Sequence, residues 1–514
     1  MVNTMKWELN RRGFLLGAAA AASLGPTRLM AAEGPKKGGV LRLGVLGGDL
    51  AQTLDPASTA GSLDQMVQMM TRNGLVEILP NGDLGPELAE SWEADDSLQK
   101  WTFKIRKGVT FHSGKPLTVD DVVFSIRHHI KDGSSSPAKG TLSAIVDVRA
   151  DGPDHMVVEL SGPNADFPYM FGDNYMRIVP DGTTDFLDGN GTGPYILTSF
   201  EPGVRATGKR NPDYFKSDRA HFDEISLLVV ADESARIAAL QAGQIDAMDR
   251  VGYKVLPMVE RAANIRVLEA VGRQHFNFAM LADHAPFDNL DLRLAMKYGI
   301  DREAIVKLVL NGRGYVGNDH PIARNAKFFN SELPQRAYDP DKAQFHLKKS
   351  GLAGTPLQLH VSEAAFAGAI DMGSLYKESA SKAGINFDLV RSPNDGYWAT
   401  VWQKVPWFTS YWAGRPTEDW MLTSTYSKGA PHNESHWSND RFNQLLVAAR
   451  GEADENRRRE MYWEMQQLIS DDGATVIPVF ANYVTLVSDK IAHGDVSPMW
   501  ILDGYKATER WWFA

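Results

Sequence analysis

The chain has 514 residues, of which 43% are apolar and 23% are charged, and these are the proportions of a globular protein, not of a disordered or fibrous one. It contains no cysteine, which excludes disulfides, thiolate metal sites and a cysteine nucleophile. The formal net charge of −10 argues against nucleic acid as a partner, and at roughly 150 residues per domain the length predicts two to four domains.

Residues 1–32 have the organisation of an export signal. Arg11 and Arg12 precede the short apolar run 17–24, and a turn with Pro26 follows it. The run is too short to cross ~30 Å of hydrocarbon, so it predicts a cleaved signal peptide instead of an anchor. The arginine pair resembles a twin-arginine signal, and a Sec signal with two adjacent arginines is the alternative. Because the chain has no cysteine, we do not expect a lipoprotein.

Beyond this segment, strand patterns and helix patterns mix along the whole chain. Period-2 alternation predicts strands, and 3.6-residue periodicity with capping residues predicts helices. The predicted strands are residues 40–45, 101–105, 156–160, 225–230 and 357–361. The predicted helices are residues 62–75 (with Ser62 as N-cap), 119–129, 233–242, 288–298, 301–310 and 340–350. Without repeats or a long linker, this mixture predicts an α/β chain that crosses between lobes more than once.

No motif in the sequence has the specificity of a catalytic or metal site. Residues 312–317 match G-x-G-x-x-G, but they follow a predicted helix, so a Rossmann phosphate loop is not expected. Residues 188–193 resemble the start of an EF-hand loop, but Ser199 stands where its bidentate glutamate belongs. His128 and His129 are adjacent on a predicted helix and cannot share one metal face. We therefore predict no catalytic residue, no metal ligand and no cofactor.

Residues 397–426 are much richer in aromatic side chains than the 10% of the whole chain. At the centre of this segment, Tyr411 and Trp412 are followed by Arg415, Glu418 and Asp419. Aromatic walls with a few charges are typical of a polar ligand site. In the alternative interpretation the tryptophans are core residues and the two acids cap the next helix. The residues alone leave both interpretations open.

Several blocks carry a resemblance to a known family. Residues 88–93 read LAESWE, residues 101–125 read WTFKIRKGVTFHSGKPLTVDDVVFS, and shorter landmarks are GTGPY at 191–195, NPDYF at 211–215, GQID at 243–246 and IDREAIV at 300–306. Together they resemble the extracytoplasmic solute-binding proteins of the peptide/opine/nickel class (family 5, similar to dipeptide- and oligopeptide-binding proteins), which serve ABC importers. The resemblance covers essentially the whole chain after residue 32.

The resemblance implies an α/β, two-lobe periplasmic-binding-protein fold (type II, cluster C-like) with an extra small N-terminal α/β subdomain. Lobe I would comprise residues 33–65, 191–276 and 475–514. The inserted subdomain would comprise residues 66–190 and would hold the long signature block as a scaffold. Lobe II would comprise residues 277–474, and a β-strand hinge would join the lobes around an enclosed ligand.

The resemblance also implies part of a binding site. In peptide-binding members, an acidic residue after a W-x-G stretch pairs with the peptide amine. Counting from Trp412, Glu418 falls on that position and Asp419 lies one further. The arginine that holds the peptide carboxylate in dipeptide-binding members is missing from residues 359–366, and Arg415 is the candidate replacement. With Trp412 and Tyr411 as aromatic walls, the implied ligand carries an amine.

The expected function is therefore that of the substrate-binding component of an ABC importer, not of an enzyme. It would capture a small amine-bearing solute (a peptide, opine or amino-acid derivative) in the periplasm as a soluble monomer and deliver it to a membrane permease. Alternatives are a chemosensory or chaperone-like binding protein, a metal- or haem-binding member, and a glycoside hydrolase. The last is disfavoured because glycosidase carboxylates flank a bond at ~5–9 Å, which adjacent acids cannot do.

Overall fold

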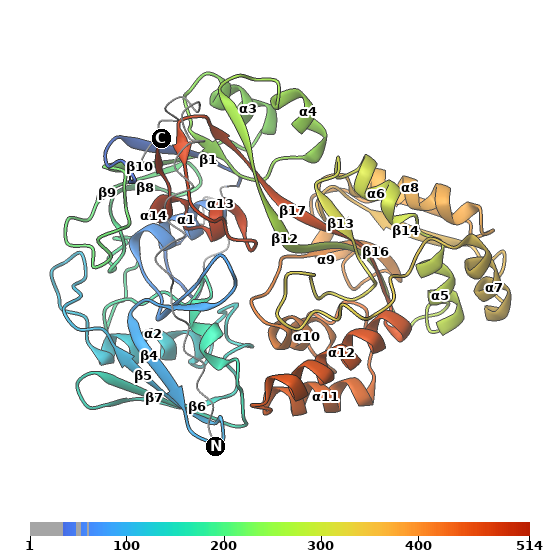
Figure 1. Ribbon diagram of the computed structural model, residues 1–514, viewed down its shortest axis with the longest axis horizontal. Helices are drawn as coiled ribbons and strands as arrows, with labels where there is room; N and C mark the ends of the chain where they lie inside the picture. The colour runs from blue at the N-terminus through green and yellow to red at the C-terminus, as the bar shows by residue number, and fades with distance from the viewer. Residues whose placement is uncertain (1–33, 48–52, 59–60) are drawn as a thin grey trace, which may run out of the picture.

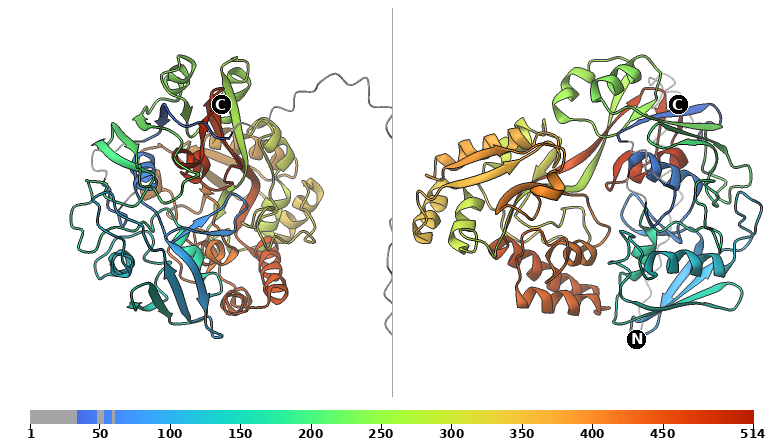
Figure 2. Two further views of the ribbon diagram at one scale, coloured as in Figure 1. Left: turned by 60° about the vertical axis from the view of Figure 1, so that its left-hand side comes forward. Right: turned by 180° about the vertical axis from the view of Figure 1, so that it is seen from behind.

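The structure, a computed structural model, describes residues 34–47, 53–58 and 61–514, so the predicted signal peptide lies outside the described residues. The described chain forms two bodies that are joined by the long strands β12 (Ile265–Met280) and β17 (Thr475–Ser488), as Figure 1 shows. In the view from behind, the same two strands pass from one body to the other (Figure 2). Their crossing therefore defines the boundary at which a ligand could be enclosed.

One mixed sheet runs through both bodies. Within the described residues it has 11 strands in the order β15-β14-β16-β12-β17-β11-β1-β10-β9-β8, with β13 on β17. Its strands besides β12 and β17 are β1 (Val40–Val45), β8 (Tyr195–Glu201), β9 (Arg205–Arg210), β10 (Glu224–Val229), β11 (Ala247–Met248), β13 (Gly314–Val316), β14 (Leu357–Val361), β15 (Phe387–Arg391) and β16 (Trp407–Trp412). We call the part with β1 and β8–β11 the first lobe and the part with β13–β16 the second lobe.

The strand pair between the lobes is irregular where it crosses. β12 and β17 are antiparallel, but their register shifts between Ala270 and Gln274. Gly272 lies in this irregular stretch, and a Cβ atom there would come within 2.2 Å of the carbonyl oxygen of Ala481. Only glycine allows so close an approach of the two backbones. The pairing is therefore interrupted where the chain passes between the lobes, and a second shift follows between Phe276 and Phe278, which is compatible with a hinge at this crossing.

A separate small sheet belongs to the third part of the molecule, the inserted subdomain, which packs on the first lobe. It orders β4 (Ala89–Ala94), β5 (Lys100–Ile105), β7 (His155–Leu160) and β6 (Ile145–Asp151), and α2 (Val119–Ile130) covers it. Thr118 and Asp121 form a capping box at the start of α2. The subdomain also contains the hairpin β2 (Val76–Ile78) and β3 (Leu84–Pro86) and the 3₁₀ turn η1 (Phe167–Gly172).

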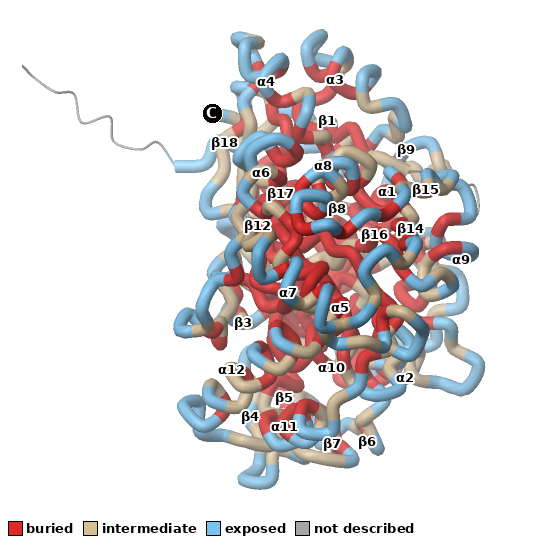
Figure 3. The backbone as a smooth tube through the Cα atoms, turned by 90° about the vertical axis from the view of Figure 1, so that its right-hand side faces the viewer, coloured by how far each residue is buried: buried red, intermediate tan, exposed pale blue. Residues whose placement is uncertain are grey.

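The remaining elements surround the large sheet. In the first lobe they are α1 (Ser62–Thr71), α3 (Glu233–Gln241), η2 (Tyr253–Val255), α4 (Leu256–Val259), β18 (Ile491–Ala492), α13 (Ile501–Gly504), α14 (Ala507–Arg510) and β19 (Trp512–Phe513). In the second lobe they are α5 (Leu290–Tyr298), α6 (Arg302–Leu308), α7 (Pro340–Ser350), α8 (Ala369–Ser381), α9 (Tyr397–Thr400), α10 (Glu418–Tyr426), α11 (Asp440–Arg450) and α12 (Glu455–Asp472). Figure 3 shows buried backbone through the middle of the molecule beneath an exposed surface.

Most predicted elements form, and one differs for a tertiary reason. β1, α7 and β14 have the predicted bounds. The helix predicted at 62–75 ends at Thr71, and its N-cap is Gly61, so the prediction of Ser62 as N-cap was wrong. The Thr71 carbonyl accepts a hydrogen bond from the Gly193 N–H group at 2.9 Å, in the GTGPY turn. A contact from a distant part of the chain thus occupies the Thr71 carbonyl, which would otherwise accept the next hydrogen bond of the helix.

Candidate ligand-binding site

A cavity of about 450 Å³ lies between the two lobes, beside the crossing of β12 and β17. Its volume is within the roughly 300–1,000 Å³ that is usual for small-molecule sites. Both lobes line it: it is bounded by Leu46, Arg250, Val251, Gly252, Tyr253, Gln274, Phe276, Glu363, Ala364, Ala365, Phe366, Ala367, Tyr411, Ala413, Tyr483, Val484, Trp500, Ile501 and Tyr505. A second hollow of about 520 Å³, lined by residues of and around α6 and β13, belongs to the second lobe alone.

Aromatic side chains form most of the wall. Tyr253, Tyr483 and Tyr505 come from the first-lobe side, and Tyr411 comes from β16 of the second lobe. The Tyr253 hydroxyl donates to the carbonyl oxygen of Asn482 at 2.9 Å, so this ring is fixed in place. Rings of this kind give a bound solute a large apolar contact and polar edges at once.

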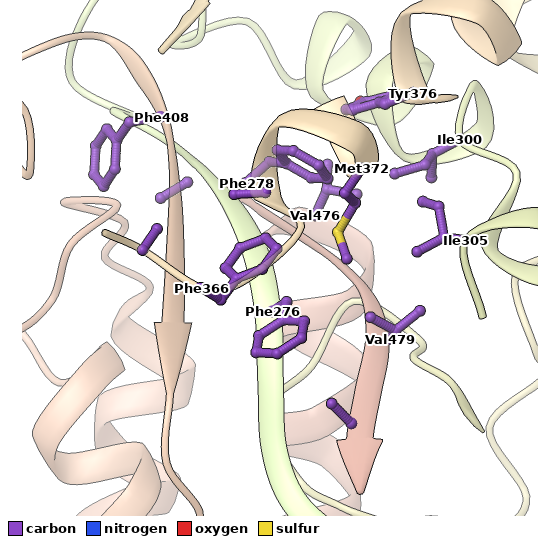
Figure 4. Close-up of a cluster of buried hydrophobic side chains, with 14 of the residues drawn as sticks. Phe276, Phe278, Ile300, Ile305, Phe366, Met372, Tyr376, Phe408, Val476 and Val479 are labelled. Atoms are coloured by element: carbon purple, nitrogen blue, oxygen red, sulfur yellow. The ribbon is translucent and has the colours of Figure 1, made fainter. Parts of the chain in front are cut away.

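Two phenylalanines anchor the wall in the core. Phe276 on β12 and Phe366, which follows β14, stack with ring centroids 4.1 Å apart and planes 4° from parallel. Figure 4 shows both rings next to each other at strand β12, with the labelled buried side chains of the same cluster around them. The cavity therefore rests on a close-packed hydrophobic core instead of on a mobile loop.

The first-lobe wall contains a strained turn. Trp500, Leu502, Asp503 and Tyr505 all have positive φ, between 48° and 61°. Each such residue costs of order 1–3 kcal/mol, and strain of this kind collects at ligand sites. The Asp503 carboxylate stabilises the turn by accepting from the Ser497 N–H group at 2.8 Å and from Arg510 at 3.0 Å. The turn places Trp500 and Tyr505 in the wall of the cavity.

Two charged side chains of opposite sign face the cavity from opposite lobes. Arg250 follows β11 in the first lobe, and Glu363 follows β14 in the second. Both residues are exposed to the open space of the cleft. Their charges can orient a polar solute within the aromatic wall.

Of the side chains predicted from the sequence, Tyr411 lines the cavity and Trp412 stands behind it. The Trp412 indole donates to the Glu434 carboxylate at 2.9 Å. Glu434 is buried and also accepts from Trp402 at 2.7 Å and from Ser410 and Asn277 at 2.6 Å each. Trp412 thus belongs to a hydrogen-bond network centred on Glu434 that fixes the strand next to Tyr411.

Arg415 lies at the border with the inserted subdomain, outside the residues that line the cavity. Its guanidinium donates to the Ala413 carbonyl at 3.1 Å and lies 5.9 Å from the centre of the Trp412 ring. Burial raises the pKa of Asp173, in the subdomain, to about 6, and the Arg415 charge acts against this rise. Arg415 therefore interacts with the second lobe through Ala413 and Trp412 and with the inserted subdomain through the charge of Asp173.

Glu418 and Asp419 are also outside the residues that line the cavity, in the first turn of α10. Glu418 accepts from the Phe328 N–H group at 2.7 Å. Asp419 accepts from Arg450 at 3.1 Å and from the Thr423 hydroxyl at 3.2 Å. Both carboxyls are buried, which raises their pKa values. The structure thus gives each acid protein partners within its own lobe.

Residues that the sequence reasoning missed dominate the cavity: Arg250, Glu363, Tyr483, Trp500 and Tyr505. They come from four separate segments. Two of them had a local signal: Arg250 follows the GQID landmark closely, and Glu363 lies in residues 359–366, where the resemblance places a ligand-binding arginine.

Among the residues that the structure describes, two groups of side chains have the spacing of metal ligands. Asp283, His284 and His436 bring their ligand atoms within 4.8 Å of one another near the surface. Glu77, Glu87 and Glu509 do so in the interior, but Lys216 already pairs with all three. Neither group lies at the cavity between the lobes. Among the helices of the described residues, none is both long and apolar enough to cross a membrane.

Comparison with known proteins gives this architecture a family context. The family model described as "Bacterial extracellular solute-binding proteins, family 5 Middle" matches residues 83–434. The probable D,D-dipeptide-binding periplasmic protein DdpA of Escherichia coli is 25% identical over 480 residues, covering 87% of this chain and 90% of that protein.

Solved structures agree in fold. The substrate-binding protein CtaP of Listeria monocytogenes superimposes with a TM-score of 0.81 at 21% identity, covering 93% of this chain and all of that one. The periplasmic binding protein DppA of Helicobacter pylori, in complex with the peptide STSA, gives a TM-score of 0.79 at 20% identity over 92% of this chain and 98% of that one. The predicted two-lobe α/β fold is thereby confirmed.

Proposed function

The chain belongs to family 5 of the bacterial extracellular solute-binding proteins, and on this premise we propose that it is the substrate-binding component of an ABC importer. It captures a small solute between its lobes and presents the closed form to a membrane permease. It acts as a soluble monomer and carries out no chemistry on the solute. The periplasmic names of relatives such as DdpA support this assignment.

The observation that carries the proposal is the cavity of about 450 Å³ that both lobes line. A solute in this cavity touches the first lobe through residues such as Tyr505 and the second through Tyr411. Because it makes contacts with both lobes only when they are closed, it shifts the equilibrium towards the closed form. Such a change is what a permease can recognise.

The ligand we propose is an amine-bearing solute: a peptide, an opine or an amino-acid derivative. The electron-rich faces of Tyr253, Tyr411, Tyr483, Trp500 and Tyr505 suit an ammonium group with an apolar body. DdpA is named for D,D-dipeptides and the Helicobacter protein is in complex with a peptide, and both facts support this class. Of the residues predicted from the sequence, we assign Tyr411 to direct contact with the solute. Trp412 and Arg415 instead hold Tyr411 and the segment around it in position.

Export belongs to the same proposal. We propose that residues 1–32 direct the folded protein to the periplasm as a twin-arginine signal, on the strength of Arg11, Arg12 and the apolar run that follows. A folded two-lobe protein is a suitable cargo for that route. Cell fractionation of the unaltered chain checks the destination.

Native mass spectrometry of the freshly purified protein tests the proposed function. We expect a bound small molecule that is released on unfolding, and we expect the Tyr411→Ala variant to retain less than a tenth of it, because one wall of the cavity is lost. Phe345→Ala is the matched control, since Phe345 is 60% exposed on α7. A mass equal to the bare chain, or full retention by the Tyr411 variant, would contradict the proposal.

A further inference from the structure

Arg250 occupies a backbone position that the surrounding structure enforces. Its φ angle is 47°, in the left-handed region that a side chain other than glycine rarely adopts. The Arg250 carbonyl accepts from Arg236 at 3.3 Å, and Arg236 is buried and also donates to the Val230 carbonyl at 2.6 Å. The strain is therefore maintained by a fixed partner, and the arginine side chain is directed to the cavity.

The Arg250 guanidinium has no carboxylate within ion-pair distance in the part of the chain that the structure describes. Although Arg250 is exposed to the cleft, desolvation by the surrounding protein opposes its charge, and the nearby Tyr505 and Tyr411 hydroxyls and the Asp249 carboxyl nevertheless keep the pKa of Arg250 raised. The Asp249 carboxylate accepts a hydrogen bond from the Leu46 N–H group at 2.8 Å, through Oδ1. A guanidinium has five N–H donors arranged for a carboxylate, and Arg250 lines the cavity, so it can offer donors to a solute there.

Glu363 gives the opposite lobe a negative charge. Its carboxylate accepts from the Gly368 N–H group at 2.7 Å and from the Ile370 N–H group at 3.3 Å, at the start of α8. The N-terminus of a helix is a favourable place for a negatively charged side chain. An ionised carboxylate offers about four acceptor positions, so two remain for another donor. Glu363 and Arg250 thus face one cavity without forming an ion pair with each other.

We propose that the cavity binds a zwitterion whose carboxylate is held by Arg250 and whose amine faces Glu363. This inference rests on the proposed function and narrows the solute class. The solute would join a cation on the first lobe to an anion on the second, so both charge-assisted contacts form together only when the lobes close. The solute body between the two charges packs against Tyr411 and Tyr505.

A binding experiment with defined probes tests this inference. The full-length protein is unfolded to remove bound molecules and refolded, and the probes that it then retains are measured. The probes are an equimolar mixture of dipeptides, the same mixture as C-terminal amides, and the same mixture N-acetylated. We expect the free dipeptides to be retained, and the amides and acetylated forms to bind at least tenfold more weakly, because each lacks one charge. The dipeptide that the protein retains from the mixture is identified, and its affinity is then measured alone by titration calorimetry.

Variants then assign the two ends. Arg250→Gln should weaken binding of the retained dipeptide between about 10- and 100-fold but leave the affinity for its amide unchanged. Arg250→Lys should lose less, because it keeps the charge without the planar fork. Glu363→Gln should reduce discrimination against the acetylated form. Arg391→Gln, at an exposed position at the end of β15, is the control and should match the parent protein.

Three results would overturn the inference: amides retained as well as acids, an Arg250→Gln variant with parental affinity and a parental melting curve, or no retention of any dipeptide. In each case the mass-spectrometric test of a co-purified solute still decides the proposed function separately. If the protein binds a solute and the affinity does not change when Arg250 is substituted, the proposed function holds but the ligand belongs to a different class.

Discussion

Glu418 and Asp419 show how a side chain can fit a pattern and be used for a different purpose. In the sequence they follow Trp412 at the spacing of an amine-binding acid. In the structure they open α10 behind its N-cap Thr417, where acids are stabilised by the helix dipole. Their accepted hydrogen bonds come from Phe328, Arg450 and Thr423. Their role in ligand binding stays a prediction, and their geometry favours a structural role.

We expect the double variant Glu418→Gln, Asp419→Asn to lower the melting temperature and to change solute affinity by less than about twofold. Losing a charge-assisted hydrogen bond in a buried site costs on the order of 1–3 kcal/mol. Differential scanning calorimetry and titration of the same samples measure both quantities. A tenfold loss of affinity with an unchanged melting temperature would restore the amine-binding interpretation.

At the residue scale, the sequence could identify Tyr411 as a wall residue because an aromatic cluster is a local signal. It could not identify Arg250, because what distinguishes this arginine is its positive φ angle and its place in the wall of the cavity. The backbone position depends on a contact with Arg236, which no motif marks.

At the scale of elements, the inserted subdomain is joined to the first lobe by a buried ion network. Lys216 donates to Glu77 at 2.8 Å and to Glu87 and Glu509 at 3.0 Å each. Lys506 also contacts Glu87 and Glu509. Although burial opposes ionisation, these cations lower the pKa values of the three glutamates.

We expect Lys216→Met to destabilise the protein by about 3 kcal/mol near neutral pH, because it leaves buried carboxylates with too little positive charge. Lys104→Met is the control: its pair with Glu90 is largely exposed, so its loss should cost under about 1 kcal/mol. Urea unfolding measures both. Since the glutamate pKa values are lowered, the contribution is present above pH ~4.5 and is lost as the pH falls below it. Equal costs for the two variants would contradict this account of the network.

Local pattern predicted the bounds of β1, α7 and β14 because alternation, proline at a helix start and a capping aspartate act within a few residues. It failed at the end of α1, where the Gly193 turn supplies the deciding contact. The irregular pairing at Gly272 could not be predicted either, since it depends on the approach of β17 from the far end of the chain. The residue boundaries of the lobes stay predictions.

At the scale of the whole molecule, the inserted subdomain and the second lobe contact each other directly. Arg458 on α12 pairs with Asp166 at 2.6 Å, and the Ala165 N–H group donates to the Arg450 carbonyl at 3.0 Å. Trp420 of α10 packs within the hydrophobic core of the subdomain. Opening must break these contacts, so we expect bound solute to decide how much of the protein is closed.

The distance between the subdomain and the second lobe measures this directly. Because the natural chain has no cysteine, spin labels at Val146→Cys and Val447→Cys, which are 68% and 67% exposed, are uniquely placed. We predict one short distance in protein as purified, a longer and broader distribution after the solute is stripped, and recovery of the short distance when the released small-molecule fraction is added back. The same distribution in all three samples would contradict the claim that a solute held between the lobes closes this protein.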